Sequence, residues 1–192
     1  LLASSQFAHI LVNWVVTVMA VPQPLPRMDY ASGIPSAQRT LVVVPTLLTS
    51  QAGVERLVEA LEVRFLANRD QHLHFRLLTD FPDAPTQALP GDELLLSTVA
   101  QGIAQLNEKY PRGPDGEAFY LFHRPRRWHA PERTWMGFER KRGKLGELNA
   151  LLRGHGLDRF ERLVGRIEAL REVRYVITLD TDTDLPRDAA RA

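Results

Sequence analysis

The sequence of 192 residues contains no cysteine. Disulfide bonds and thiolate-ligated metal sites are therefore excluded, and the absence fits a reducing compartment. Strong charge of either sign is also lacking, because 24 Lys and Arg face 23 Asp and Glu. A net charge of +1 argues against binding of nucleic acid through bulk charge, so no nucleic-acid partner is expected. Internal repeats are missing too, and the length leaves room for one ordinary domain with a short appendage.

Charged residues are absent from the first 21 positions. This run is just long enough to span a bilayer, although polar residues such as Gln6 and Asn13 interrupt it. Its large apolar residues also recur at helical spacing on one face, as in a helix that lies in a membrane interface or packs on a core: Phe7, Leu11, Trp14, Val15 and Val18. No Lys or Arg precedes the run, so a signal peptide is not expected. The spanning and the interfacial or packed alternatives both stay open.

Four prolines follow between residues 22 and 35, with Gly33 among them. Because proline lacks an N–H and fixes φ, this stretch is typical of an extended linker. We therefore expect an apolar helix with a linker over residues 1–36 and one folded domain over residues 37–192.

Within that domain, short apolar runs alternate with segments of helical spacing. The runs predict buried strands, the first of them ended by Pro45, at residues 40–44, 74–79, 118–122 and 175–179. Helices are predicted around residues 54–65, 95–106, 145–152 and 158–170, the last with a capping box at Asp158 and Glu161. The alternation predicts βαβ units and an α/β fold with a mainly parallel sheet flanked by helices. Ligands of such sheets bind at the carboxyl ends of the strands.

An acidic run, Asp180-Thr-Asp-Thr-Asp184, follows the last predicted strand directly. In extended backbone, residues i and i+2 point the same way, so Asp180 and Asp182 could converge on one divalent cation. Mg²⁺ and Mn²⁺ prefer oxygen ligands and take one or two carboxylates together with substrate phosphates. Such a cation would stabilise a diphosphate as a leaving group. The alternative is that these aspartates cap a turn before Pro186.

Three kinds of chemistry use a motif of this type. A calcium loop needs Gly at its sixth position and Glu at its twelfth, where this chain has Leu185 and Arg191. A phosphatase or phosphotransferase of the haloacid-dehalogenase type would use Asp180 as a nucleophile, but there the motif usually opens the domain. A nucleotide-sugar transferase places the motif after a nucleotide-binding α/β half, which is the order in this chain. A non-catalytic nucleotide-sugar-binding fragment remains a further alternative.

Longer stretches resemble the transferase region of cyclic β-1,2-glucan synthases, which are very large bacterial inner-membrane enzymes. These stretches are residues 40–48, 119–126, 135–145, 148–154 and 175–186, and the similarity extends into the linker at 25–29 and 33–35. The resemblance implies a GT-A fold, Rossmann-like and incomplete in this chain. It implies transfer of glucose from UDP-glucose to a β-1,2-glucan acceptor, with inversion. It also implies a location on the cytoplasmic side of the inner membrane, with membrane association through the parent protein.

The same resemblance assigns Asp180 and Asp182 to the metal and the donor diphosphate, although Thr181 stands where the family usually has Ala. Asp80, after the second strand, would contact the uracil or ribose, and an Asx-turn cap is the alternative. Lys144 and Asn149 match a pattern that precedes the metal strand in related transferases. Near a helix N-terminus, Lys144 could contact phosphate, and a solvated lysine is the alternative.

The general base of an inverting transferase is expected after Ala192, so no catalytic residue is assigned within the chain. Expressed alone, the chain is therefore expected to transfer no glucose. Between His123 and Lys144, eight Lys and Arg face two acidic residues, which suggests an anionic ligand, a membrane surface or a solvated face. Trp128 and Trp135 could stack on sugar rings or simply pack. The single histidines His123 and His129 are given no role.

Overall fold

The computed structural model describes residues 2–20, 29–112 and 116–191. Its elements are, in chain order, α1 (Leu2–Met19), η1 (Ser36–Gln38), β1 (Thr40–Leu47), α2 (Gln51–Ala67), β2 (Leu73–Asp80), α3 (Asp92–Lys109), β3 (Phe119–His123), β4 (Arg127–His129), β5 (Thr134–Met136), α4 (Arg140–Leu152), η2 (Leu157–Arg159), β6 (Arg162–Val164), η3 (Ile167–Glu172) and β7 (Tyr175–Thr178), where η marks a short 3₁₀ helix.

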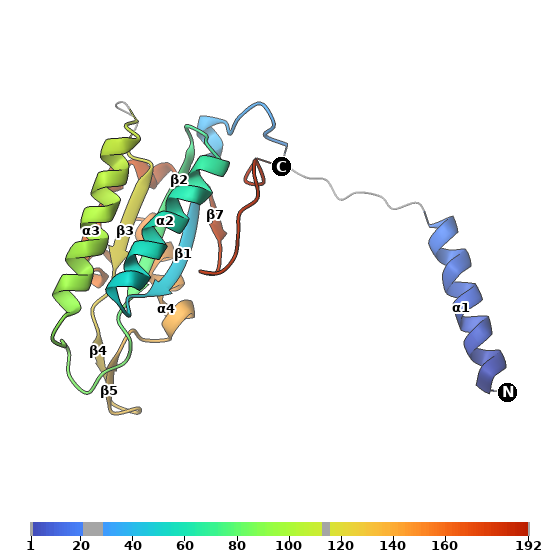
Figure 1. Ribbon diagram of the computed structural model, residues 1–192, viewed down its shortest axis with the longest axis horizontal. Helices are drawn as coiled ribbons and strands as arrows, with labels where there is room; N and C mark the ends of the chain where they lie inside the picture. The colour runs from blue at the N-terminus through green and yellow to red at the C-terminus, as the bar shows by residue number, and fades with distance from the viewer. Residues whose placement is uncertain (1, 21–28, 113–115, 192) are drawn as a thin grey trace.

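A five-stranded sheet in the order β6-β3-β2-β1-β7 forms the centre of the domain (Figure 1). In this sheet, strands β3, β2, β1 and β7 run parallel to one another, and β6 runs antiparallel to its neighbour β3. Helices α2 and α3 pack on one face, through residues such as Leu61 and Val99, and α4 and η3 pack on the other, through Leu148 and Leu170. The predicted α/β class, with a mainly parallel sheet flanked by helices, is confirmed.

Strand β1 continues past Pro45, so the prediction that this proline ends the strand is wrong. Backbone groups of alternate residues in β1 point to opposite neighbours. The N–H groups of Thr40 and Leu48 donate toward β2, whereas the carbonyl of Val43 accepts from the N–H of Leu179 on the β7 side. Pro45 therefore faces the β7 side, where β7 has already ended at Thr178. Its missing N–H leaves no ladder bond unmade, which is the position in which a sheet tolerates proline.

Residues 158–170 are not the predicted helix. They form η2, then β6 against β3, and the start of η3. The apolar spacing fits a helix, but Gly165 interrupts it with φ +103° and lies against the ring of Tyr120. Because β3 has an open edge here, the apolar residues of β6 pack as a strand instead.

Strand β7 lies at the edge of the sheet and is half-exposed, whereas the sequence predicts a strand buried on both faces. It pairs with β1 only, and Val176 remains 43% exposed. Its successor Leu179 is buried, so the chain stays attached to the domain as it enters the acidic run.

The apolar N-terminal run forms the helix α1, and its side chains from Ser5 to Met19 are exposed, among them Phe7 and Trp14. In the described parts of the chain, no helix combines the length and the apolar character needed to cross a membrane. Most of the proline-rich linker lies outside the described residues. Near its end, Ile34 is buried in the core and donates its N–H to Asp70 at 2.9 Å. The domain boundary at residues 36 and 37 stays a prediction.

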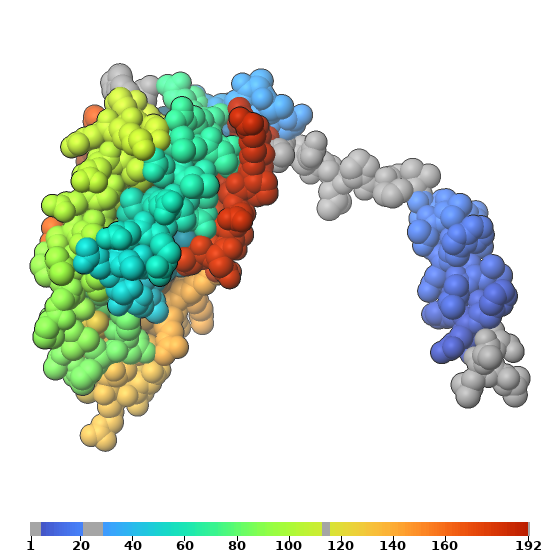
Figure 2. All heavy atoms as spheres, in the orientation of Figure 1, coloured from blue at the N-terminus to red at the C-terminus, as the bar shows by residue number. Residues whose placement is uncertain are grey.

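The last described segment lies beside α2 (Figure 2) and returns toward the amino ends of the strands (Figure 1). Tyr30 donates its N–H to the carbonyl of Arg191 at 2.9 Å, and Asp188 donates to the carbonyl of Ala67 at 3.1 Å. These bonds hold the start and the end of the folded region together.

Candidate nucleotide-sugar site

A cleft of about 390 Å³ opens at the carboxyl ends of β1 and β2, where the topology predicts a ligand site. It lies between the ends of these two strands and the first turn of α4. Its lining residues are Pro45, Thr46, Leu47, Asp80, Phe81, Pro82, Asp83, Gly137, Arg140, Lys141 and Lys144. Two of the donor residues predicted from the sequence, Asp80 and Lys144, therefore meet in one cleft.

The carboxylate of Asp80 is buried and fully engaged by cations. Arg124, just after β3, donates from Nε and Nη2 to its two oxygens at 2.8 Å each. Lys144 lies 3.1 Å from Asp80 Oδ2. A forked pair of this kind fixes the carboxylate in position. Asp80 is thus the shared counter-ion of two cations, a role different from the Asx-turn cap that the sequence left as the alternative.

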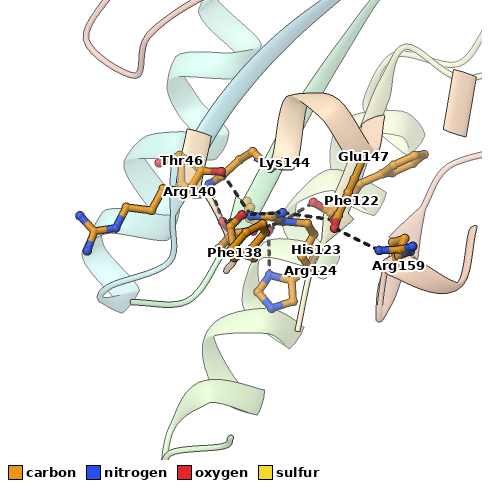
Figure 3. Close-up of polar contacts among 11 residues, drawn as sticks. Thr46, Phe122, His123, Arg124, Phe138, Arg140, Lys144, Glu147 and Arg159 are labelled. Carbon is orange, nitrogen blue, oxygen red and sulfur yellow. Dashed lines mark hydrogen bonds and ion pairs between the residues drawn. The ribbon is translucent and has the colours of Figure 1, made fainter. Parts of the chain in front are cut away.

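Lys144 is 3% exposed and donates to the carbonyl of Thr46 at 2.7 Å, so it ties α4 to the end of β1 (Figure 3). Burial lowers the pKa of Lys144, and the neighbouring Asp80 works against that change. The alternative of a solvated lysine is wrong. The ammonium of Lys144 is already bonded to protein oxygens, so we expect phosphate to contact the more exposed Arg140 and Lys141 of the same helix turn.

Arg124 extends the network from β3 to α4. Its Nη1 donates to Glu147 Oε2 at 3.2 Å, and its guanidinium also contacts the carbonyls of Phe138 and Arg140 (Figure 3). Burial opposes its charge, but the bonds to Asp80 and Glu147 raise the pKa of Arg124. The floor of the cleft thus joins three strand ends to one helix.

Gly137 allows the backbone before α4 to approach this floor closely. A Cβ at this position would lie 2.5 Å from Asp80 Oδ2 and 3.0 Å from Arg124 Nη2. Only glycine leaves room for the ion pair beneath it.

The wall of the cleft is the basic first turn of α4. Arg140 pairs with Asp83 at 2.9 Å, and Lys141 pairs with Asp180. All four side chains are at least partly exposed, so these are surface pairs that a ligand can displace at small cost. Lys141 connects the cleft to the acidic run, although Asp180 does not line the cleft itself.

The acidic run is not extended. Strand β7 ends at Thr178, and Thr183 donates its N–H to the carbonyl of Asp180 at 3.0 Å, which closes a turn. The premise that Asp180 and Asp182 share one face of extended backbone is therefore wrong. Both carboxylates are exposed at this turn, and their role as metal ligands stays a prediction.

Helix α2 holds this turn from behind. Arg64 Nη2 donates to the carbonyls of Thr181 and Thr183 at 2.8 Å each, and Asn68 donates to the carbonyl of Pro186 at 3.0 Å. Burial lowers the pKa of Arg64. The bonds from α2 to the carbonyls of Thr181, Thr183 and Pro186 fix the backbone that carries the aspartate side chains.

Two sequence proposals do not join the site. Asn149 is exposed and does not line the cleft, because it lies five residues beyond Lys144, about 140° around the helix. Trp128 and Trp135 pack against each other at a tilt of 58° in the β4–β5 hairpin, with ring centroids 5.9 Å apart. His123 is buried and bonds Thr79 through Nδ1 at 2.9 Å.

Comparison with known proteins supplies a relative that fits this architecture. Over 189 residues, or 98% of the chain, the sequence is 43% identical to the cyclic beta-(1,2)-glucan synthase NdvB of Rhizobium meliloti (strain 1021). The resemblance inferred from the sequence is confirmed. The chain spans 6% of the length of that synthase. No family model matches the chain.

The match to the glucan synthase takes in the cleft from β1 to α4 and extends to the acidic run. Within it, sequence reasoning missed the structural roles of Arg124, Gly137, Lys141 and Arg64. Some signals were available: Arg124 follows a strand, and Lys141 belongs to the basic segment. Arg64 could have been found because it continues the buried stripe of α2, where a charged residue needs partners.

A metal can be tested against these residues by the chemistry of its ligands. Within the described ranges, no three His, Asp or Glu side chains are grouped to hold an ion. Asp180 and Asp182, exposed and two residues apart in the sequence, nevertheless offer the carboxylate oxygens that Mg²⁺ or Mn²⁺ takes when a diphosphate supplies its remaining ligands. Asp180 already has a cation, the ammonium of Lys141, beside it. The donor set therefore fits a cation that arrives with its ligand.

Proposed function

We propose that this chain is the donor-binding part of a GT-A glycosyltransferase that acts in β-1,2-glucan synthesis. The donor is UDP-glucose, and the acceptor is a growing β-1,2-glucan. The observation that carries the proposal is the convergence of Asp80, Lys144 and the basic first turn of α4 at the carboxyl edge of a parallel sheet. The identity to a cyclic glucan synthase over nearly the whole chain supports the same reading.

The diphosphate of the donor belongs at the first turn of α4 in this proposal. Arg140 and Lys141 are exposed there and are held only by surface pairs. The free N–H groups at a helix N-terminus add attraction for an anion. The uridine then extends toward Asp80, whose carboxylate lies fixed at the floor of the cleft.

Asp180 and Asp182 would hold Mg²⁺ or Mn²⁺ at the open side of the diphosphate. When bound, the cation neutralises negative charge on the leaving group. Lys141 already bridges the space between the cleft and Asp180. The turn that carries the two aspartates is held by Arg64, so its backbone is fixed before any ligand arrives.

Acceptor activation requires a free carboxylate, and both described carboxylates of the cleft are paired before a ligand binds. Asp80 is paired with Arg124 and Lys144, and Asp83 is paired with Arg140. We therefore expect the chain alone to bind donor without transferring glucose, because a missing base typically costs about 10²–10⁴ in rate. In the cell, we place the region on the cytoplasmic side of the bacterial inner membrane, as part of a larger membrane-associated protein.

Isothermal titration calorimetry tests the proposal directly. UDP should bind in Mn²⁺ or Mg²⁺ and should lose its binding in EDTA. Asp182→Asn should lose the metal-dependent binding, whereas Asp158→Asn, which removes an exposed charge on η2, should retain it. Equal binding by both variants would reject a metal-bridged diphosphate.

Other outcomes separate the alternatives. Turnover of a phosphoester together with beryllofluoride capture at Asp180 would indicate a phosphotransferase of the haloacid-dehalogenase type. Metal-independent UDP binding would indicate a non-catalytic binding module. No binding under any condition would contradict a donor site in this chain.

A further inference from the structure

A buried arginine without an acceptor lies on the sheet face covered by α4 and η3. Arg76 stands in the middle of β2, in register with Val43 on β1 and Tyr120 on β3. It is completely buried, yet none of its three guanidinium nitrogens has a hydrogen-bond partner among the described residues. Buried arginines normally donate to several oxygens, so the lack of an acceptor at Arg76 suggests that a ligand supplies one.

An aromatic ring faces the charge of Arg76. The guanidinium carbon of Arg76 lies 3.1 Å from the centroid of the Phe122 ring. A ring face attracts a cation but accepts none of the in-plane N–H groups. Phe122 therefore holds the guanidinium from one side, and its buried N–H groups are left without an acceptor among the described residues.

A cavity of about 140 Å³ adjoins Arg76. Its apolar walls come from α4 and η3, and two exposed charged residues of η3, Glu168 and Arg171, complete its lining. A single water needs only about 10–15 Å³ on this scale, so the cavity is large enough for a small polyatomic ion.

Other polar groups around Arg76 offer hydrogen-bond donors or stay neutral. Burial raises the pKa of Tyr120, so its hydroxyl keeps its proton and remains a hydrogen-bond donor. Burial lowers the pKa of His74 to about 4, so this ring is uncharged near neutral pH. Arginine keeps its proton under all ordinary conditions. The buried groups near Arg76 therefore supply hydrogen-bond donors, and the one carboxylate in the described lining of the cavity is that of the exposed Glu168.

We propose that this cavity binds a small oxyanion, a phosphate or a carboxylate, through the guanidinium of Arg76. The fork of N–H groups matches two oxygens of either ion. The site is separate from the donor cleft, because the two sets of lining residues have no member in common.

Denaturation of the 192-residue chain at constant ionic strength tests the site. Sodium phosphate and sodium acetate are the two oxyanion probes, and each is compared with sodium chloride. Phosphate at ten times its dissociation constant should raise the folding equilibrium constant about 11-fold. Arg76→Met should lose this site-specific part of the stabilisation. Arg56→Met, which removes an exposed arginine of α2, should keep it and thereby controls for general salt effects and for phosphate in the donor cleft. An equal phosphate response in the two variants would overturn the proposal.

A second measurement applies if Arg76→Met fails to fold. In the wild-type chain with ¹⁵N-labelled arginine, one buried side-chain Nε–Hε signal should shift on titration with phosphate, and Arg76→Lys should lack that signal. Absence of any responding buried arginine would contradict the site. The proposal also fails if Glu168→Gln destabilises the chain as much as Arg76→Met while phosphate has no effect on the wild type, because Glu168 would then be the counter-ion.

Discussion

Asp80 shows that a residue at a predicted strand end can have a second role that the sequence hides. Its place at a strand end predicts a ligand contact, and the structure indeed places it in the cleft. The same carboxylate neutralises two buried cations, Arg124 and Lys144. A contact to a nucleoside must therefore be made without breaking these pairs.

Replacement of Asp80 by Asn should destabilise the fold, because it leaves two buried cations without their common counter-charge. Breaking a buried pair costs about 3–5 kcal/mol. Asp83→Asn breaks only a surface pair with Arg140 and should cost about 0–1 kcal/mol. Urea denaturation of the two variants measures both values. Similar losses in the two variants would show that the Asp80 network contributes little.

Two buried histidines should make stability depend on pH. Burial lowers the pKa of His74 and of His123 to about 4, from an ordinary value of 6.5. Between these values the unfolded chain binds more protons, so the free energy of unfolding should fall as pH drops from about 6.5 to 4. The slope should reach about 1.4 kcal/mol per pH unit for each histidine.

Urea denaturation at pH 7 and pH 5 checks this prediction with matched variants. His123→Gln should remove part of the slope, and His155→Gln, at an exposed position, should leave it unchanged. A flat pH profile in the wild type would mean that both rings already accept protons in the folded chain.

Among the elements, apolar patterns identify what is buried better than what conformation it adopts. The strands from β1 to β3 and the helices from α2 to α4 lie where the sequence predicts them. The region around β6 fails, because its spacing suits a helix while the open edge of β3 selects a strand. Such a choice depends on a partner distant in sequence, which periodicity within one segment does not contain.

Gly165 should be the most sensitive point of this misread region. Its φ of +103° is strained for any other residue, and an added methyl group would overlap the Tyr120 ring. Gly165→Ala should cost about 1–3 kcal/mol for the backbone and a further 1–3 kcal/mol for the overlap. Gly91→Ala is the control, because its φ is +96° but no atom lies within 4 Å of an added Cβ. Chemical denaturation should show the larger loss at Gly165, and equal losses would exclude the steric part.

Across the whole molecule, the candidate site also combines features that sequence position predicts with features that depend on distant residues. Strand-end position places Asp80 correctly, and the pattern around Lys144 leads to the same cleft. Asn149 fails because a pattern in sequence does not fix which side of a helix faces the ligand. A turn at the acidic run was left as the alternative to an extended backbone, and the sequence could not decide between them because the turn is held by Arg64, a residue on another element far earlier in the chain.

Deletion of residues 1–21 should leave the α/β domain folded. The described side chains of α1 from Ser5 onward are exposed, so its removal takes no packing from the core. We expect higher solubility and weaker binding to liposomes, because the large apolar residues of α1 are lost. Circular dichroism and vesicle flotation measure these effects. Unfolding after the deletion would mean that α1 packs on the domain, and unchanged flotation would locate membrane affinity elsewhere.

The place of β1 between β2 and β7 has a consequence for synthesis on the ribosome. Thr40 is aligned with Tyr175, so β1 waits for its second neighbour until the chain has been made as far as β7. At about 5–20 residues per second, β7 follows β1 on the order of ten seconds later. During that interval β1 and β2 can pair, since their connection is short, while the other flank of β1 stays open. The aspartate turn thus joins the nascent domain after the floor of the cleft has had time to form.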